Sequence, residues 1–161
     1  MHALKDCVGR CCRLAILGLW AFAFTVPAFA QTEKVVEAAA RGQIVSQEMC
    51  SGIELCQQTE LTGVATHIGR FSGLLSERVD LMTGRYSGTA VFTTPDQSTI
   101  ATEYTGNVTP PDQTGRVFFF ERHDVVGGTG RFAGADGTLD VSGTGDAAGA
   151  FEIVGVGILS N

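Results

Sequence analysis

Short alternations of apolar and polar residues run through the chain from residue 58 to its end. They are interrupted by Gly, Thr, Asp and Pro, which are typical turn residues. A period of two places successive side chains on opposite faces of a strand, so the pattern predicts antiparallel strands joined by hairpins. The predicted strands lie near residues 43–48, 58–68, 71–81, 86–94, 98–106, 115–126, 131–142 and 149–159.

The number and spacing of these strands limit the fold. Eight short strands with short connections favour a closed up-and-down barrel or a sandwich. The stretch at 33–41, EKVVEAAAR, has a different residue pattern, because it combines helix-forming residues with an acidic start and a basic end. It predicts a short helix or an arm before the first strand.

The first thirty residues have the pattern of a secretory signal peptide. Lys5, Arg10 and Arg13 precede an apolar run at 14–26, and Ala-Phe-Ala at 28–30 matches a cleavage site. The run is shorter than the roughly 20 residues of a membrane-spanning helix, although an uncleaved anchor is the alternative. We therefore predict a secreted or periplasmic protein without a membrane segment after cleavage.

Removal of residues 1–30 leaves 31–161, a length suited to one domain. Of 11 basic and 17 acidic residues, three basic and one acidic residue lie in the leader, so the remainder carries a net charge of −8. Nucleic acids and anionic membranes select basic surfaces. The charge therefore argues against both as partners.

Two cysteines, Cys50 and Cys56, remain after the leader. A close pair in an exported chain is typical of a disulfide, and it would close a seven-residue loop worth about 2.4 kcal/mol in chain entropy. A metal or redox site is the alternative, but the C-x5-C spacing has no further Cys or His nearby. We predict the disulfide.

A short motif recurs along the chain. It reads GRFSG at 69–73, GRYSG at 84–88 and GRFAG at 130–134, with a degenerate Gly115-Arg116. The spacing suits neighbouring strands of a barrel, with Gly in the turn and the aromatic packed under the barrel end. The arginines are expected to ring one rim, where they could attract an anion or pair with acids on neighbouring strands.

The same glycines mimic a dinucleotide fingerprint, since 128–133 matches G-x-G-x-x-A. That fingerprint needs a helix directly after the glycines, and the following GADGTLDVSGTG cannot form one. We expect no cofactor.

The run GGTG at 127–130, followed by Phe132, Ala135 and Gly137, resembles the GGTG-x-F motif of dirigent proteins and of the allene oxide cyclase barrel superfamily. Together with Thr66 to Phe71, it is similar to small exported bacterial barrels of unassigned function. The resemblance covers residues of about 60 to 159. It implies an all-β, eight-stranded antiparallel up-and-down barrel with an interior cavity. No catalytic residue of those families matches this chain position by position, and fold alone does not transfer function.

Strand alternation predicts which side chains enter the cavity. In 117–125 the face with Phe119, Glu121 and His123 is assigned inward, and in 71–81 the apolar face includes Glu77. In 58–68 the inward register contains His67 beside small residues. Other strands place Tyr104 with Ile100 and Thr102, and Tyr86 with Ala90 and Phe92.

These registers predict an apolar cavity with few polar groups, the usual composition of a small-molecule site. We assign Glu121 and His123 as candidate general acid and base. The ligand-contacting candidates are His67, Glu77, Tyr104 and Phe119. The alternative is that these polar side chains only bond to one another, and a one-residue slip would turn each set outward.

A metal site built from His67, His123 and Glu121 lacks a spacing motif, and we assign none. The sequence also has no G-x-S-x-G or H-E-x-x-H motif, which argues against a hydrolase or zinc enzyme. We expect a barrel that binds a small hydrophobic molecule. The alternatives are a cofactor-free cyclase or isomerase and an oligomeric, partner-binding surface protein.

Overall fold

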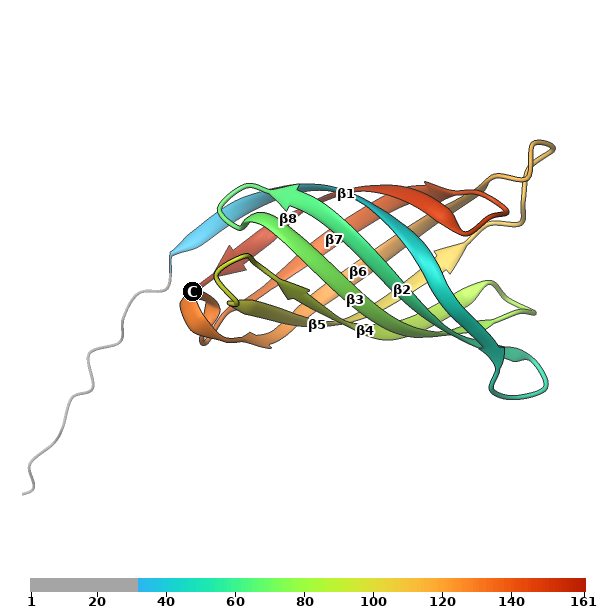
Figure 1. Ribbon diagram of the computed structural model, residues 1–161, viewed down its shortest axis with the longest axis horizontal. Coiled ribbons are helices and arrows are strands. Elements are labelled where there is room, and N and C mark those ends of the chain that lie inside the picture. The colour runs from blue at the N-terminus through green and yellow to red at the C-terminus, as the bar shows by residue number, and fades with distance from the viewer. Residues whose placement is uncertain (1–31) are drawn as a thin grey trace, which may run out of the picture.

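The protein is a closed antiparallel barrel of eight strands in sequential order, as the computed structural model shows for residues 32–161 (Figure 1). The predicted fold class is confirmed. The signal peptide predicted at 1–30 lies outside the described residues. The strands are β1 (Glu33–Met49), β2 (Glu54–Ala65), β3 (Gly69–Asp80), β4 (Arg85–Thr93), β5 (Thr99–Val108), β6 (Val117–Gly128), β7 (Asp136–Gly145) and β8 (Ala150–Ser160).

The first strand corrects the prediction for the start of the domain. Residues 33–41 were expected to form a helix or an arm, but they belong to β1 together with the predicted strand at 43–48. β1 pairs with β2 on one side and β8 on the other, and it thereby removes the two open edges of the sheet. Pairing with both neighbours overrides the local helix propensity of the alanines.

The predicted strand at 131–142 was also wrong in its first part. Gly130–Phe132 form a single 3-10 turn, η1, and β7 begins only at Asp136. Gly130 and Gly134 have φ of 60° and 77°, a left-handed conformation that ends a strand. This segment lies across one end of the barrel, near the C-terminus in Figure 1.

The Gly-Arg repeat marks turns, but at both ends of the barrel. The glycines at 69, 84, 115 and 130 have φ between 60° and 84°, so the prediction that Gly makes the turn is confirmed. Successive strands run in opposite directions, which puts Arg70 and Arg131 at one end and Arg85 at the other. The expected single ring of arginines was therefore wrong. Arg131 pairs instead with Asp96, Nε to Oδ2 3.2 Å.

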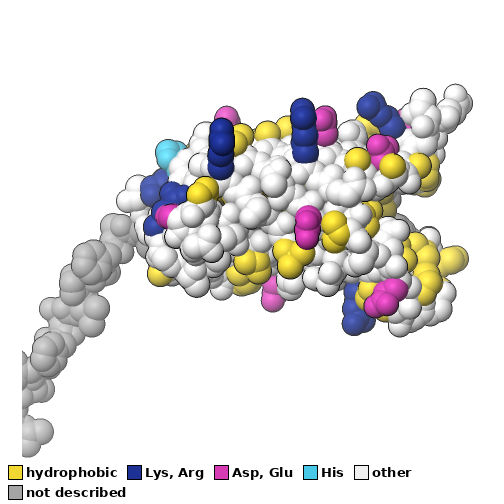
Figure 2. Space-filling view, in the orientation of Figure 1, with side chains coloured by type: hydrophobic (Ala, Val, Ile, Leu, Met, Phe, Trp, Pro, Cys, Tyr) yellow, Lys and Arg dark blue, Asp and Glu magenta, His cyan; other side chains and the backbone are white. Residues whose placement is uncertain are grey.

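Apolar and charged side chains are interspersed on the outer wall (Figure 2). The expectation of an oligomer or of a partner-binding surface stays a prediction. Within residues 32–161 no helix is long and apolar enough to cross a membrane. The most exposed apolar side chains on outward positions of the strands are Val35, Val64, Leu74, Phe120, Val126, Val154 and Val156.

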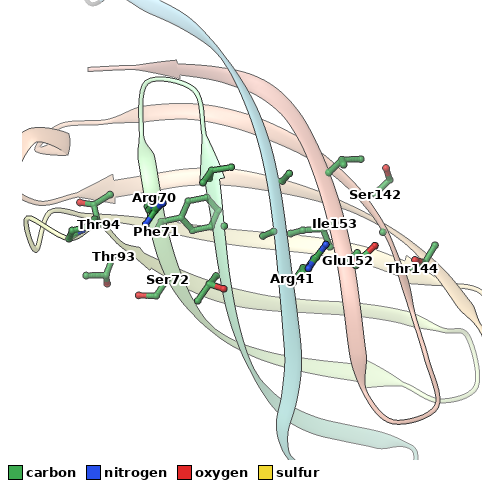
Figure 3. Close-up of a pocket in the computed structure, with 18 of the residues that line it drawn as sticks. Arg41, Arg70, Phe71, Ser72, Thr93, Thr94, Ser142, Thr144, Glu152 and Ile153 are labelled. Atoms are coloured by element: carbon green, nitrogen blue, oxygen red, sulfur yellow. Dashed lines mark ion pairs between the residues drawn. The ribbon is translucent and has the colours of Figure 1, made fainter.

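The outer wall also has a wide, shallow hollow of about 1040 Å³ that is lined by residues of β1, β2, β3, β6, β7 and β8 and of the β4–β5 turn (Figure 3). Most of its side chains point to solvent, and its one ion pair joins Arg41 Nε to Glu152 Oε1 at 3.1 Å. Both partners are largely exposed, so the pair contributes little. The buried ionisable side chains lie elsewhere, inside the barrel.

Candidate functional site

The two ends of the barrel differ in how they are filled. At the barrel end that carries η1, the interior is closed by a cluster of buried apolar side chains, and Phe132 among them is only 2% exposed. At the opposite end the inward side chains are only half-buried, among them Leu55, Val108 and Val117. Access to the interior is therefore through the end that carries the β1–β2, β3–β4, β5–β6 and β7–β8 turns (Figure 1).

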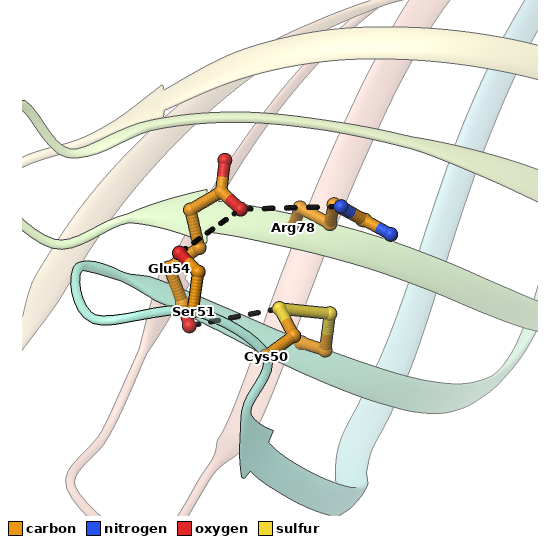
Figure 4. The surroundings of a disulfide bond; sticks show 5 residues. Cys50, Ser51, Glu54 and Arg78 are labelled. Carbon is orange, nitrogen blue, oxygen red and sulfur yellow. Dashed lines mark hydrogen bonds and ion pairs between the residues drawn. A yellow bond between two sulfur atoms is a disulfide. The ribbon is translucent and has the colours of Figure 1, made fainter.

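The β1–β2 turn at this open end contains the predicted disulfide (Figure 4). Cys50 and Cys56 are bonded, with their Cα atoms 5.6 Å apart. Beside them Glu54 accepts a hydrogen bond from Ser51 at 3.2 Å and lies 3.9 Å from Arg78. The turn is thus tied to itself and to β3. A disulfide of this kind is compatible with an exported protein.

A cavity of about 200 Å³ occupies the open half of the barrel. Most of its wall is aliphatic or aromatic, and its polar side chains include Gln57, Thr59, Glu77, Tyr86 and Glu121. A second space of about 70 Å³ lies beyond it toward the closed end. The two spaces share the lining side chains Leu61, Leu75, Glu121 and Ile153, which form a partition between them.

Glu121 stands in this partition and is held on both oxygens. Tyr86 donates its hydroxyl to Oε1 at 2.9 Å, and the imidazole Nε2 of His123 lies 2.9 Å from Oε2. The other imidazole nitrogen is 2.9 Å from the hydroxyl of Thr102. Thr102, His123 and Glu121 thus form a chain of hydrogen bonds that ends at the cavity. His123, in the middle of this chain, is only 2% exposed. The imidazole fixes the carboxylate in place.

Glu77 forms a second polar centre on the wall of the open-end cavity. Gln57 donates its side-chain amide to Oε1, and the hydroxyl of Tyr104 donates to Oε2 at 2.9 Å. Burial raises the pKa of Glu77, and the nearby charge of Glu121 adds to the effect. The two hydrogen bonds and His123 lower it, but the net effect is a pKa above the usual range of a glutamic acid.

The tyrosines are hydrogen-bond donors that retain their protons. Burial raises the pKa of Tyr86 and Tyr104 well above the usual range for a phenol, and the neighbouring carboxylates raise it further. Each therefore orients a carboxylate without giving up its own proton. The Tyr86 and Tyr104 rings meet edge to face, 6.3 Å between centroids.

Two glycines make room for these rings. A Cβ on Gly106 would lie 2.4 Å from Cζ of Tyr86, and one on Gly88 would lie 2.9 Å from Cζ of Tyr104. Each tyrosine thus covers a glycine of the adjacent strand and packs against bare backbone. The position of the phenol groups depends on these glycines.

The predicted inward faces are confirmed for most candidate residues. Phe119, Glu121 and His123 point inward from β6, and Glu77 and Tyr104 do so from β3 and β5. Phe119 lines the open-end cavity. The roles assigned to these side chains stay predictions.

The inward placement of His67 was wrong. β2 ends at Ala65, and His67 lies exposed in the β2–β3 turn with φ of 63°. It is separated from His123 and Glu121, so the three cannot share a metal. In the part of the chain that the structure describes, no three His, Cys, Asp or Glu side chains are grouped to hold a metal ion.

Sequence reasoning missed several polar members of the site. Gln57 was not recognised because the predicted strand began at 58, whereas β2 begins at Glu54. Thr59 lies inside the predicted strand and on its inward face, but it was not singled out. Tyr86 and Thr102 were grouped with apolar residues of their own strands, but their bonds to Glu121 and His123 arise only from the pairing of strands.

Neither a family model nor a curated protein sequence matches the chain. Among solved structures, a pterocarpan synthase dirigent protein is similar in fold, with a TM-score of 0.46 and 15% sequence identity. The match covers 81% of this chain and 84% of that protein. It concerns the fold and indicates nothing about the ligand or reaction of this chain.

Proposed function

We propose that the protein binds a small, largely apolar molecule in the cavity at the open end of the barrel. The observation that supports this most directly is the cavity itself, with about 200 Å³ of space between apolar walls and a few fixed polar groups. An apolar wall with few oriented polar side chains is the usual composition of a ligand site. The volume lies below the typical range of roughly 300–1,000 Å³, so the ligand is small.

The entrance fits an apolar ligand as well. Leu81 and Met82, in the β3–β4 turn, are 54% and 78% exposed, and Ile53 in the β1–β2 turn is 51% exposed. The backbone N–H of Leu81 donates to the carbonyl of Ile53 at 3.0 Å, so these turns lie side by side. An apolar molecule would therefore meet apolar side chains before it enters the barrel.

A fluorescent hydrophobic probe tests the proposal. The native protein should bind it at about one per chain, and Val117→Trp, which fills the entrance, should abolish binding. Val91→Trp is the matched control, because Val91 points outward from β4 with 44% exposure. Circular dichroism and thermal unfolding show whether both variants fold. Absence of probe binding to the native protein, or equal binding by both folded variants, would overturn the proposal.

A second candidate function is proton transfer by Glu121 in a cofactor-free cyclase or isomerase. It is favoured by the chain from Thr102 through His123 to a carboxylate that borders both interior spaces. Glu121 would take a proton from a carbon next to a carbonyl and return it at another position, so that no cofactor is consumed. His123 would keep the carboxylate oriented.

This second function requires the carboxylate of Glu121 for turnover. If substrate screening finds a turnover, Glu121→Gln should abolish it without unfolding the protein. Glu103→Gln serves as the control, since Glu103 points outward from β5. Unchanged turnover in Glu121→Gln would remove this residue from the reaction and leave only binding.

A further inference from the structure

We infer that the molecule held in the open-end cavity is a small apolar amine, with its ammonium group bound between the carboxylates of Glu77 and Glu121. The inference rests on the proposed binding function and specifies the chemical class of its ligand. It excludes fatty acids and other anions. Four features of the cavity support it, namely its charge, its free acceptor positions, an unpaired hydroxyl and its size.

The charge of the cavity is of one sign. The carboxylic acids in its wall are Glu77, Glu121 and Asp146, and no Lys or Arg is among the described residues that line it. His123 contacts the far side of Glu121 and does not line the open-end cavity itself. Glu77 is bonded only to the neutral side chains of Gln57 and Tyr104, and two buried carboxylates in one cavity are costly, so a ligand cation would supply positive charge on the cavity side. An anionic ligand would be repelled.

Both carboxylates are oriented and still have acceptor capacity. Each of the four oxygens accepts one hydrogen bond, on Glu77 from Gln57 and Tyr104, and on Glu121 from Tyr86 and His123. An ionised carboxylate offers about four acceptor positions, so each group can accept a further bond. An ammonium group has three donors and no acceptor, which matches a wall that offers acceptors.

Thr59 supplies an independent sign of a missing ligand group. Its side chain is buried, with 3% of the residue exposed, and its hydroxyl has no hydrogen-bond partner in the described chain. It lines the same cavity as the two carboxylates and lies two residues from Gln57 on the inward face of β2. Buried polar groups are nearly always paired, so an unpaired hydroxyl facing a cavity points to a polar group of the ligand. It can accept the third ammonium hydrogen.

The remaining wall sets the size of the apolar part. Side chains such as Leu55, Val79, Phe119 and Phe151 surround a space of about 200 Å³, and none of them can bond to a polar group. At about 30 Å³ for each water molecule, the cavity has the volume of about seven waters. One aromatic ring with a short aminoalkyl arm fills such a space. Benzylamine is therefore a suitable probe.

Binding of a cation should also oppose the raised pKa of Glu77. Burial and the charge of Glu121 raise its pKa, and an ammonium group beside it would act in the opposite direction. Binding of the cation should thus release a proton from the fraction of protein in which Glu77 is protonated. The titratable or polar groups that face Glu77 from the other strands and turns are Gln57, Tyr86, Tyr104, Glu121, His123 and, at the β7–β8 turn, Asp146.

Titration calorimetry with three probes of similar size and different charge tests the inference. At pH 7.5 benzylamine should bind at least tenfold more tightly than benzyl alcohol, and benzoate should not bind. Glu77→Gln and Glu121→Gln should each weaken benzylamine at least tenfold and change benzyl alcohol less than twofold. Glu103→Gln, on the outer face of β5, is the matched control and should bind all probes like the native protein.

Thr59→Val separates the hydroxyl from the carboxylates, because valine keeps the shape of the side chain. It should weaken benzylamine about threefold or more. Three results would overturn the inference while the binding function stands: equal affinity for amine and alcohol, tighter binding of benzoate, or carboxylate variants that retain the preference for the amine. If none of the three probes and no fluorescent probe binds, the binding function fails together with the inference.

Discussion

The ring of Tyr104 is stacked on the imidazole of His123, with 4.5 Å between their centroids and 17° between their planes. Tyr104 bonds to Glu77, and His123 lies 2.9 Å from Glu121. The stack therefore joins the two carboxylate centres into one buried unit. A substitution at one carboxylate should therefore also affect the other carboxylate through the stacked rings.

The hydroxyl of Tyr104 can be removed without removing the stack. Tyr104→Phe should lower the free energy of unfolding by about 1.5–3 kcal/mol at neutral pH, because Glu77 loses a donor to a charged or partly charged group. Urea unfolding measures the change. Tyr86→Phe makes the same deletion at Glu121 and should have an effect of similar size. A loss below about 0.5 kcal/mol in both variants would show that the phenols do not stabilise the carboxylates.

The pH dependence of stability should reveal the raised pKa of Glu77. Between its unfolded pKa of about 4.3 and its higher folded pKa, the native state holds more protons than the unfolded state, so stability falls as pH rises. Glu77→Gln removes this fall. The stability of the variant relative to the native protein should therefore increase with pH across this window and then stay constant.

Urea unfolding at intervals from pH 4 to pH 8 checks this. Asp80, Asp96 and Asp112 have pKa values lowered by local hydrogen bonds and act in the opposite direction, with stability lost as pH falls. Their contributions to stability are the same in the native protein and in Glu77→Gln, so they cancel when the two unfolding free energies are subtracted. A difference that does not vary with pH would contradict a raised pKa for Glu77.

Much of the barrel could be predicted because alternation is uninterrupted in the middle strands. The inward face of β6, with Phe119, Glu121 and His123, follows from the simple period of two. The first half of β1 was missed because its alanines have helix propensity and become a strand only by pairing with β2 and β8. Local sequence contains no information about that pairing.

The site was predictable in part for the same reason. The face of Glu77 follows from its own strand, but its neighbours come from other strands. Gln57 lies opposite Glu77 because of the β2–β3 register, and Tyr104 reaches it from β5. His67 has the correct parity for the interior, but the turn begins before it and turns its side chain to solvent. Strand ends and strand pairing therefore limited the prediction.

The disulfide should stabilise the open end of the barrel. Replacing Cys50 and Cys56 together by Ala should cost about 2.4 kcal/mol, because the seven-residue loop gains freedom in the unfolded state. Unfolding of the oxidised protein and of the double variant gives the difference. Thiol labelling of the native protein under denaturing conditions should detect no free thiol in residues 32–161, and two labelled thiols there would show that the bond does not form.

Gly106 should be intolerant of even a methyl group. Gly106→Ala places a Cβ 2.4 Å from the Tyr86 ring, which must shift away from Glu121. We expect a loss of about 1–3 kcal/mol from overpacking, together with weaker binding in the cavity. Gly52→Ala is the control, since a Cβ there meets nothing within 4 Å. Equal stability of the two variants would mean that the ring can move without cost.

Phe132 should hold the closed end of the barrel together. Its side chain is 2% exposed and packs with Val36, Ile100, Ala135 and Leu159. Phe132→Ala should cost about 3–5 kcal/mol, because the cavity left at this end cannot easily collapse between paired strands. Phe120→Ala is the matched control, since Phe120 is 61% exposed on the outer wall, and its loss should stay within about 0.5 kcal/mol. If the apolar cluster at the closed end blocks access to the interior, folded Phe132→Ala protein should also admit a hydrophobic probe through that end. More than one probe should then bind per chain. A small loss of stability and unchanged probe binding would show that η1 lies on the barrel end without closing it.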